Sequence, residues 1–305
     1  MGHVYHKHLV EGVTIPAIIH NLNYYLIQMA VYENGTVSCW KRSDLAQFRD
    51  DLTKGWVVTQ IPTDSNISVH NLGFFHISAA SWKYDIDEYF LHIKDIVHSL
   101  NPEMTNLYHT TKRETDKWKN AKVSWRDSPI PCKLKSPFGY NLLDGDSCYI
   151  FYRKDDHLYL TPMTVYADKT IQIDAAGEQL YSQNDIEELF AANILCTCPK
   201  NDELVKIEGL GEIVLDASNG QLSVKDKLAE IADTLARVSG EKDSLELCQT
   251  AHYQYLTDPN DITREMLRKA YEAVPEHQRM FLGDMDNRDS DIIRILNYPN
   301  SKREV

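Results

Sequence analysis

The sequence lacks the signatures of several common enzyme classes. The phosphate-binding pattern G-x-x-x-x-G-K-S/T does not occur, and no G-x-S-x-G nucleophile elbow is present. Gly209-Leu210-Gly211 is not followed by the third glycine of a dinucleotide-binding fingerprint. No apolar run is long enough to cross a bilayer. These absences argue against P-loop and dinucleotide-binding enzymes, α/β-hydrolases and integral membrane proteins.

Cysteine is scarce and irregularly spaced. Cys196-Thr197-Cys198 lacks the C-x-x-C spacing of redox and zinc motifs, and no second pair supports it. We therefore expect reduced thiols and no cofactor. The N-terminal region lacks the basic-then-apolar layout of a secretory signal, so we expect a cytoplasmic protein. The six cysteines are Cys39, Cys132, Cys148, Cys196, Cys198 and Cys248.

Positive charge is in short supply. The chain has 32 Lys and Arg against 45 Asp and Glu, which gives a net charge of −13. The most basic stretch, residues 112–126, is interrupted by Glu114 and Asp116, as is typical of an exposed mixed-charge segment. An acidic chain repels phosphate backbones, so nucleic acid is not expected as a partner. A basic protein suits this charge better.

The sequence does contain an internal repeat. Residues 24–32 return as 158–166, which is 134 positions later, and residues 71–77 return as 209–215, which is 138 positions later. Two copies of one pattern predict two copies of one domain, and a length of 305 residues allows two ordinary cores. The expected boundaries are 1–118 and 119–240 for the two repeats and 241–305 for a helical C-terminal segment, with residues 105–137 as connector.

Each repeat follows the order strands, short helix, strands, longer helix. Apolar runs at 14–20 and 24–32 predict a hairpin, and Asn34-Gly35 predicts a second turn after it. Helical spacing of apolar residues predicts the longer helices at 89–100 and 224–238. This order predicts an α+β protein with two tandem copies of an antiparallel sheet covered by helices.

Capping residues predict where several helices begin. Ser43 is the expected N-cap of the short helix in the first repeat, and Asn184 is its counterpart in the second. Ser223 is expected to cap the longer helix of the second repeat, and Asp261 a helix in the C-terminal segment. Pro275 is expected to end that last helix.

Positions that differ between the repeats are the candidates for function. Cys39 and His70 suggest a nucleophile and its base, and His20 with His70 suggests a shared metal or proton. The alternative is structural, because a strand cysteine is usually a small buried hydrophobe. The distinctive residues of the first repeat are His20, Cys39, Trp40, Asp44 and His70, and Lys154, Ile173, Asp174 and Glu208 align with His20, Cys39, Trp40 and His70.

Tryptophans offer a second kind of site. Trp40, Trp56 and Trp82 suggest an aromatic binding surface in the first repeat. Strand alternation places Cys39 and Trp40 on opposite faces, so both cannot easily line one pocket.

Two groups of residues resemble metal ligands without meeting the full requirement. The acidic run at 284–291 offers alternating oxygen ligands, yet it lacks the glycine and distal glutamate of an EF-hand loop. Histidines near the N-terminus do not form a preorganised site. We expect no metal, and the weak candidates are Asp284, Asp286, Asp289 and Asp291, with His3, His6 and His8 at the other end of the chain.

Several short segments resemble a domain of uncharacterised bacterial proteins. They are Ile15-Pro16-Ala17, Cys39-Trp40, Gly55-Trp56-Val57 and His70-Asn71-Leu72-Gly73 in the first repeat, with residues 270–277 and 283–286 in the tail. The resemblance implies a bacterial, cytoplasmic origin and brings no activity, cofactor or site residue with it.

Three functions remain open from the sequence. The favoured one is a non-enzymatic interaction protein that binds a protein partner, such as an immunity protein, an antitoxin or a defence-associated adaptor. The first alternative is a metal-dependent or Cys/His hydrolase or nuclease, with its site in the first repeat or the acidic tail. The second alternative is a small-molecule sensor that uses the tryptophans.

Overall fold

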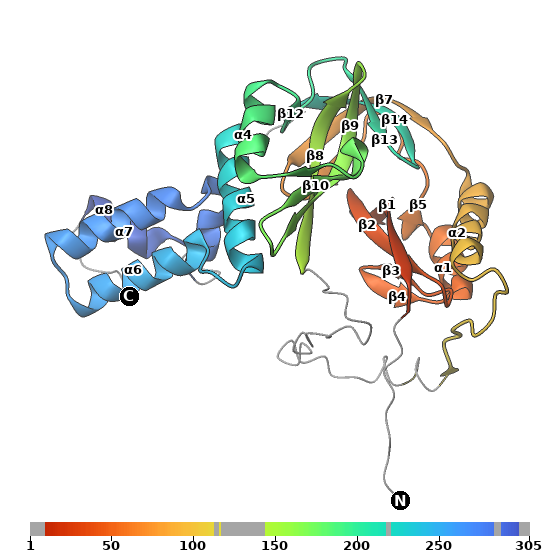
Figure 1. The fold of residues 1–305 in the computed structure, drawn as a ribbon, viewed down its shortest axis with the longest axis horizontal. Coiled ribbons are helices and arrows are strands. Elements are labelled where there is room, and N and C mark those ends of the chain that lie inside the picture. Colours follow the sequence, from red (N-terminus) through yellow and green to blue (C-terminus); the bar gives the residue numbers. More distant parts are fainter. Residues whose placement is uncertain (1–9, 113–115, 117–143, 218–220, 284–287, 299–305) are drawn as a thin grey trace, which may run out of the picture. The chain divides into compact units, whose positions relative to one another are not determined.

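The computed structural model describes residues 10–112, 116, 144–217, 221–283 and 288–298. The chain forms two compact units, of which unit 1 comprises Met1–Tyr140 with Lys200–Asn219, and unit 2 comprises Asn141–Pro199 with Gly220–Val305 (Figure 1). Both contain strands and helices, and the order of elements in the first repeat returns in the second. The structure thus confirms an α+β fold with tandem copies. The boundaries at 118 and 240 stay a prediction.

A long hairpin forms the centre of unit 1. Strands β1 (Gly12–Asn21) and β2 (Asn23–Tyr32) pair antiparallel along their whole length, as the alternating apolar pattern predicts. Strand β3 (Val37–Cys39) continues the sheet beside β2, and β4 (Lys41–Ser43) pairs with β3. On the other side, β5 (Val57–Val58) pairs with β1. The strand β5 therefore ends this sheet.

One strand pair makes the sheet of unit 1 mixed rather than purely antiparallel. Strand β6 (Asn66–Val69) joins β2 in parallel, and β7 (Gly73–Trp82) returns antiparallel to β6. Parallel neighbours need a long crossover connection. Here the chain between β2 and β6 includes the helix α1 (Leu45–Thr53), which serves that purpose.

Unit 1 also contains the last two strands of the second repeat. Strand β13 (Leu204–Ile207) pairs with β14 (Gly211–Ala217), and β14 pairs antiparallel with β7. In this ladder Ile77 lies opposite Leu215, its own counterpart 138 positions later. The two repeats therefore meet at equivalent strands.

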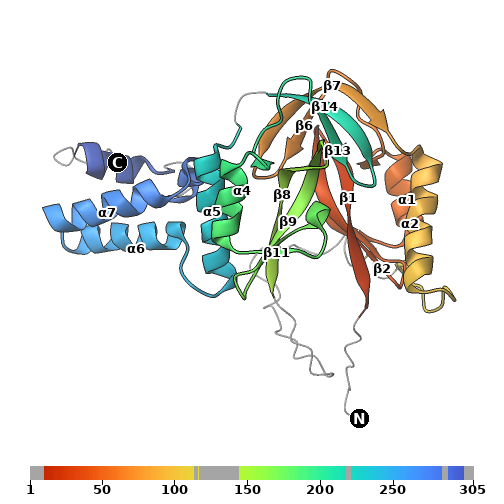
Figure 2. The ribbon, with the colours of Figure 1, turned by 45° about the horizontal axis from the view of Figure 1, so that its top comes forward.

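Two helices lie in the described part of unit 1 beside these strands. The helices α1 and α2 (Ile86–Leu100) lie side by side, and α2 packs on β2 (Figure 2). The N-cap of α1 is Asp44 and not Ser43, which was predicted. Ser43 instead belongs to β4, and its hydroxyl donates to Asp51 at 3.0 Å. The large buried side chains of this core include Phe48, Leu52, Phe75, Tyr89 and Ile93.

Unit 2 repeats the hairpin with one small difference. Strands β8 (Gly145–Lys154) and β9 (His157–Tyr166) pair over their full length. Their turn contains Asp155 and Asp156, whereas the first hairpin turns at Leu22 alone. The extra residue shifts the alignment of the first strand by one position. His20 therefore corresponds to Arg153, whereas the sequence alignment paired it with Lys154.

Short strands and two helices surround the second hairpin. Strand β10 (Ile171–Ile173) pairs with β9 and with β11 (Leu180–Tyr181), and β12 (Leu195–Cys196) pairs with β8. A 3-10 turn, η1 (Asp174–Ala176), follows β10. The N-cap of α4 (Gln183–Ala191) is Ser182, so the prediction of Asn184 was wrong. Ser223 caps α5 (Val224–Val238), as predicted.

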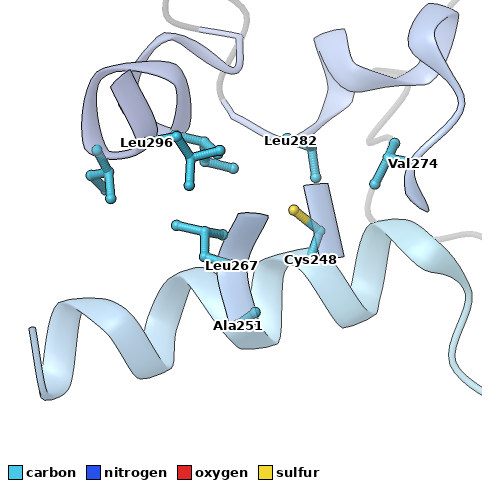
Figure 3. Close-up of a cluster of buried hydrophobic side chains, with 8 residues drawn as sticks. Cys248, Ala251, Leu267, Val274, Leu282 and Leu296 are labelled. Atoms are coloured by element: carbon cyan, nitrogen blue, oxygen red, sulfur yellow. The ribbon is translucent and has the colours of Figure 1, made fainter. Parts of the chain in front are cut away.

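The C-terminal segment is helical, as predicted, and has its own core. It contains α6 (Ser244–Thr257), α7 (Asp261–Ala273), the 3-10 turn η2 (Glu276–Phe281) and α8 (Ser290–Asn297). Asn260 and not Asp261 caps α7, and the helix ends before Pro275. Figure 3 shows the buried cluster that joins these helices, which comprises Cys248, Ala251, Leu267, Val274, Leu282, Ile292, Ile295 and Leu296.

Candidate functional site

Cys39 lies on β3 with no exposed surface. Burial, together with the nearby Asp51 carboxylate, raises the pKa of its thiol to about 11, against the opposing charge of Lys41. His70 is exposed in the turn after β6. The thiol of Cys39 thus lies in the core and His70 lies on the surface, which is not the arrangement of a nucleophile and its base. A thiol with this pKa is protonated at neutral pH and is a poor nucleophile.

Asp44 is buried and engaged in local structure. Its Oδ1 accepts the backbone N–H of Gln47 at 2.8 Å, and its Oδ2 accepts the backbone N–H of Thr110 at 2.7 Å. Burial by itself raises the pKa of Asp44, but these backbone donors outweigh it and hold the pKa below its ordinary value. The arrangement makes Asp44 a helix cap that also holds the segment after α2.

Two pairs of aromatic rings lie along the first hairpin, on opposite faces of β2, because Tyr24 and Tyr25 are consecutive residues of that strand. The ring of His20 stacks on Tyr24 with centroids 4.5 Å apart, and the backbone N–H of His20 donates to the carbonyl of Trp56 at 2.9 Å. The rings of Tyr25 and Trp40 lie 5.3 Å apart. We call the set His20, Tyr24, Tyr25, Trp40 and Trp56 the aromatic end of unit 1.

Lys41 links Trp56 to the core of unit 1. Its Nζ lies 5.9 Å from the centroid of the Trp56 ring and 2.6 Å from Oδ1 of the buried Asp51. Trp82 instead lies at the end of β7, where its Nε1–H donates to the carbonyl of Ile61 at 3.1 Å. Of the three candidate tryptophans, the structure thus places Trp40 and Trp56 at the aromatic end and uses Trp82 to hold two segments of unit 1 together.

Two exposed apolar residues at the hairpin turn and after β3 have unfavourable backbone conformations. Trp40 has φ 56° and Leu22 has φ 63°, a region in which bulky residues are rare. Their side chains are 62% and 93% exposed, so burial does not offset the strain. The second repeat has Asp174 in place of Trp40, and Asp155 with Asp156 at the turn. Strain of this kind often marks a functional position.

A groove of about 560 Å³ lies beside the edge strand β5, directly after Trp56 in sequence. Apolar side chains of Leu52, Val58 and Ile86 line it, and its charged lining residues are Asp85 and Asp87 at the start of α2. Asp87 is ion-paired with Arg49 at the rim. The groove is open, partly apolar and acidic at one end.

A buried charged group in unit 2 was not predicted. Lys227 of α5 has no exposed surface, and its Nζ lies 3.2 Å from Oε2 of Glu230 and 3.3 Å from Sγ of Cys148. Burial by itself lowers the pKa of Lys227, but Cys148 and Glu230 outweigh it and raise that pKa, while burial raises the pKa of Cys148. At neutral pH neither group is a nucleophile. The sequence could have indicated this buried lysine, because Lys227 lies four positions before Ile231 and so shares the apolar face of the helix.

The acidic tail is only partly described. Asp284 and Asp286, like His3, His6 and His8, lie outside the described residues. Asp289 accepts the hydroxyl of Tyr271 at 2.7 Å, and Asp291 lies 3.7 Å from Arg294. In the part of the chain that the structure describes, no three His, Cys, Asp or Glu side chains are grouped to hold a metal ion. Within the same part, no helix is both long and apolar enough to span a bilayer.

The helix α6 carries apolar side chains in the buried cluster and others on its surface. Cys248 and Ala251 belong to the buried cluster of Figure 3. Leu247, Tyr253 and Leu256 are instead exposed to solvent.

Family models cover almost the whole chain. One, described as "Domain of unknown function (DUF7638)", matches residues 2–104 and 134–242, and another, "Domain of unknown function (DUF7639)", matches residues 243–303. A search of curated proteins and a search of solved structures found no match. The first model spans both repeats and more than half of the chain, so the protein belongs to the family described as Domain of unknown function (DUF7638).

Proposed function

We propose that the protein is a non-enzymatic interaction protein that binds a protein partner through the aromatic end of unit 1. The observation that carries this proposal is Trp40, which is 62% exposed and held at φ 56°. Apart from its contact with Tyr25, this exposed indole in a strained conformation does little to stabilise the isolated fold. Trp and Tyr side chains that become desolvated are, however, the usual energetic centres of protein interfaces.

The neighbours of Trp40 suit the same role. The ring of Tyr25 lies against Trp40, and Leu22 is almost fully exposed at the turn of the same hairpin. The second repeat has aspartates at the places of Trp40 and Leu22, so this feature belongs to one copy only. The net charge of −13 favours a basic partner.

The hydrolase alternative receives less support. The Cys39 thiol is buried and protonated at neutral pH, and both carboxylate oxygens of Asp44 already accept backbone N–H groups. The family resemblance suggests a bacterial and cytoplasmic setting, in which an immunity protein, an antitoxin or a defence-associated adaptor would fit. The sensor alternative predicts that a metabolite raises the melting temperature.

The test compares partner capture by the wild type and two variants. Trp40→Asp introduces the residue of the second repeat, and Phe281→Asp is the matched control, because Phe281 is 60% exposed in the C-terminal segment. We expect the wild type and Phe281→Asp to retain one partner from the native host at physiological salt. Trp40→Asp should lose about tenfold or more in affinity, since hot-spot residues contribute about 2 kcal/mol or more.

Three outcomes would contradict the proposal. They are capture of no partner by the wild type, equal capture by Trp40→Asp, and loss of the cellular phenotype in His70→Ala with partner binding intact. The last outcome would favour the hydrolase. A ligand-dependent rise in melting temperature that disappears in Trp40→Asp would favour the sensor.

A further inference from the structure

We infer that a pocket of unit 2, between the start of α4 and α5, binds an extended segment of a protein partner. The segment carries an apolar side chain, followed three residues later by lysine or arginine. This inference rests on the proposed function in that the segment belongs to a protein, but it does not involve the aromatic end. The pocket has a volume of about 320 Å³, and its walls include Lys169, Ser182, Ala232, Leu235, Ala236 and Glu241, all of unit 2.

The first repeat holds a segment of its own chain at the equivalent place. After α2 the chain continues through residues 105–111 without helix or strand, and we call this stretch the docked segment. The backbone N–H of Tyr108 donates to the carbonyl of Asn34 at 2.8 Å. The backbone N–H of Thr110 donates to Oδ2 of Asp44 at 2.7 Å. Bonds from alternate N–H groups to one neighbouring surface are typical of an extended chain.

Leu107 is the apolar anchor of the docked segment. It is half-buried, and its side chain lies over Gly35 in the turn between β2 and β3. A Cβ placed on Gly35 would be 3.4 Å from Cδ2 of Leu107 and 3.3 Å from Cδ1 of Leu45, the first residue of α1. The anchor therefore packs where the hairpin turn meets the start of the short helix.

The second repeat directs the corresponding residues elsewhere. The repeats still match at the end of the longer helix, where the side chain of Ser239 donates to the carbonyl of Ala167, as Asn101 does to Glu33. Beyond that point they diverge. Leu245, which is the counterpart of the anchor 138 positions later, lies in α6 and packs against the buried cluster of the C-terminal segment. Its place beside α4 and α5 is left as the pocket.

The walls of the pocket are counterparts of the residues around the docked segment. Lys169 occupies the place of Gly35 in the hairpin turn, and Ser182 caps α4 as Asp44 caps α1. The side chain of Lys169 is ion-paired with Glu241 at 3.3 Å, and both are well exposed. This pair adds bulk at the place of the glycine, so a ligand side chain must enter closer to α5.

Small residues widen the pocket on the side of α5. Ala232 and Ala236 stand 138 positions after Lys94 and His98 of α2. Together with Leu235 they form an apolar floor. A volume of about 320 Å³ over an apolar floor is in the range of ligand pockets. The pocket therefore suits one large apolar side chain of an extended segment.

Charge specifies the residue that follows the anchor. In the first repeat the hydroxyl of Thr110 donates to Oε1 of Gln47 at 3.0 Å. The counterpart of Gln47 is the exposed Asp185, whose Oδ2 accepts the hydroxyl of Ser182 at 2.7 Å. The hydrogen bonds from Ser182 hold the pKa of Asp185 below its ordinary value, so this carboxylate is ionised at neutral pH. A lysine or arginine at the place of Thr110 would complement it, in agreement with a basic partner.

The experiment uses the docked segment as its probe. The probe is a fluorescein-labelled decapeptide of residues 103–112 that carries Thr110→Lys. One control peptide adds Leu107→Asp, and the other is the unaltered decapeptide. Binding to the full-length protein is measured by fluorescence anisotropy. We expect the probe to bind at least about tenfold more tightly than the Leu107→Asp peptide, and about threefold more tightly than the unaltered one.

Variants of the protein separate the pocket from the rest of the surface. Ala232→Phe fills the pocket, and Ala191→Phe is its matched control, because Ala191 is exposed at the end of α4. Asp185→Gln introduces the residue that completes the capping box of α1, so the fold should be retained. We expect Ala232→Phe to weaken probe binding about tenfold and Asp185→Gln to abolish the preference for lysine. Urea unfolding checks that each variant is folded.

The outcomes separate this inference from the proposed function. No measurable binding of the probe, equal affinity of the probe and the Leu107→Asp peptide, or a preference for lysine that persists in Asp185→Gln would overturn the pocket assignment whatever the partner capture shows. Probe binding that is weakened by Ala232→Phe and unaffected by Trp40→Asp, together with partner capture that does not depend on Trp40, would leave the pocket assigned and remove the role of the aromatic end.

Discussion

The closing helices of the two repeats share length, capping and position but bury different chemistry. Both α2 and α5 contain 15 residues, and each packs on the second strand of its hairpin. Tyr89 of α2 and Lys227 of α5 occupy equivalent positions, 138 apart, and both are almost fully buried. The Tyr89 hydroxyl has no hydrogen-bond partner among the described residues, whereas Lys227 pairs with Glu230. The fold therefore requires a large buried side chain here, and each copy satisfies that requirement differently.

The two repeats also differ at their surfaces, where the first repeat is the more apolar and, at the start of its longer helix, the less covered. The first repeat exposes Trp40 and Leu22 and leaves the start of α2 next to an open groove. The second has aspartates in place of Trp40 and Leu22, and its own segment around Glu276 docks on the start of α5. The second repeat thus contacts the C-terminal segment of its own chain, whereas the start of α2 in the first repeat borders a groove.

The largest expected effect lies at the buried helix position. Lys227→Met should lower the free energy of unfolding by about 3–5 kcal/mol, because it leaves the Glu230 carboxylate buried without its partner. Tyr89→Phe removes a hydroxyl that has no partner among the described residues, so it should change that free energy by less than about 1 kcal/mol. Urea unfolding at pH 7 measures both variants.

A double variant tests whether the unpaired Glu230 carboxylate causes the loss of stability in Lys227→Met. Adding Glu230→Gln to Lys227→Met should restore part of the loss, since the stranded charge is then absent. Equal losses of unfolding free energy in Lys227→Met and Tyr89→Phe would contradict the stated difference between the buried groups of the two helices.

The next effect concerns the caps of the short helices. Asp44→Ala should cost about 2 kcal/mol and Ser182→Ala about 1 kcal/mol, because Asp44 caps α1 and also accepts the backbone N–H of Thr110. Asp44→Asn keeps a capping oxygen and is the matched control. A cost at Ser182 equal to or above that at Asp44 would remove this difference between the repeats.

The pH dependence of the Asp44 effect has a definite sign. The folded-state pKa of Asp44 lies below its ordinary value, so the ionised carboxylate stabilises the fold above the unfolded pKa of about 4. That contribution is lost as pH falls through the folded pKa. The difference in unfolding free energy between wild type and Asp44→Asn should therefore shrink as pH is lowered below about 4.

The smallest effect is a gain in stability. Leu22→Gly and Trp40→Gly relieve a left-handed conformation at exposed positions, so each should leave stability unchanged or raise it by up to about 1 kcal/mol. The contact of Trp40 with Tyr25 reduces the gain at that position. A loss above about 1 kcal/mol in Trp40→Gly would mean that the indole serves the fold and not a partner. Thermal unfolding of both variants measures the change.

The sequence predicted the repeat and its elements better than the helix starts. Alternation and helical spacing are local patterns, so the hairpins and the longer helices could be predicted. The caps at Ser43, Asn184 and Asp261 were each displaced by one or two residues. Each lies beside another residue with a capping side chain, and the choice depends on where the preceding strand or turn leaves the backbone extended.

The candidate site was predicted in part. Alternation predicted opposite faces for Cys39 and Trp40; Cys39 is buried on β3, whereas Trp40 is exposed and follows the end of that strand. The sequence alignment paired His20 with a residue one position away from its structural counterpart. The two hairpin turns differ in length by one residue, and that difference is visible only in the strand register. Lys227 was missed, since a lysine on an apolar helix face is ordinarily read as a surface residue.

By itself the sequence determined that the chain is a tandem α+β protein with a helical tail, because each element's periodicity depends on neighbours within one or two turns. Only the tertiary structure decided that β6 lies parallel to β2, that β14 of the second repeat pairs with β7 of the first, and that a groove stays open beside β5. These features depend on contacts between residues far apart in the chain, whose energies no local pattern contains.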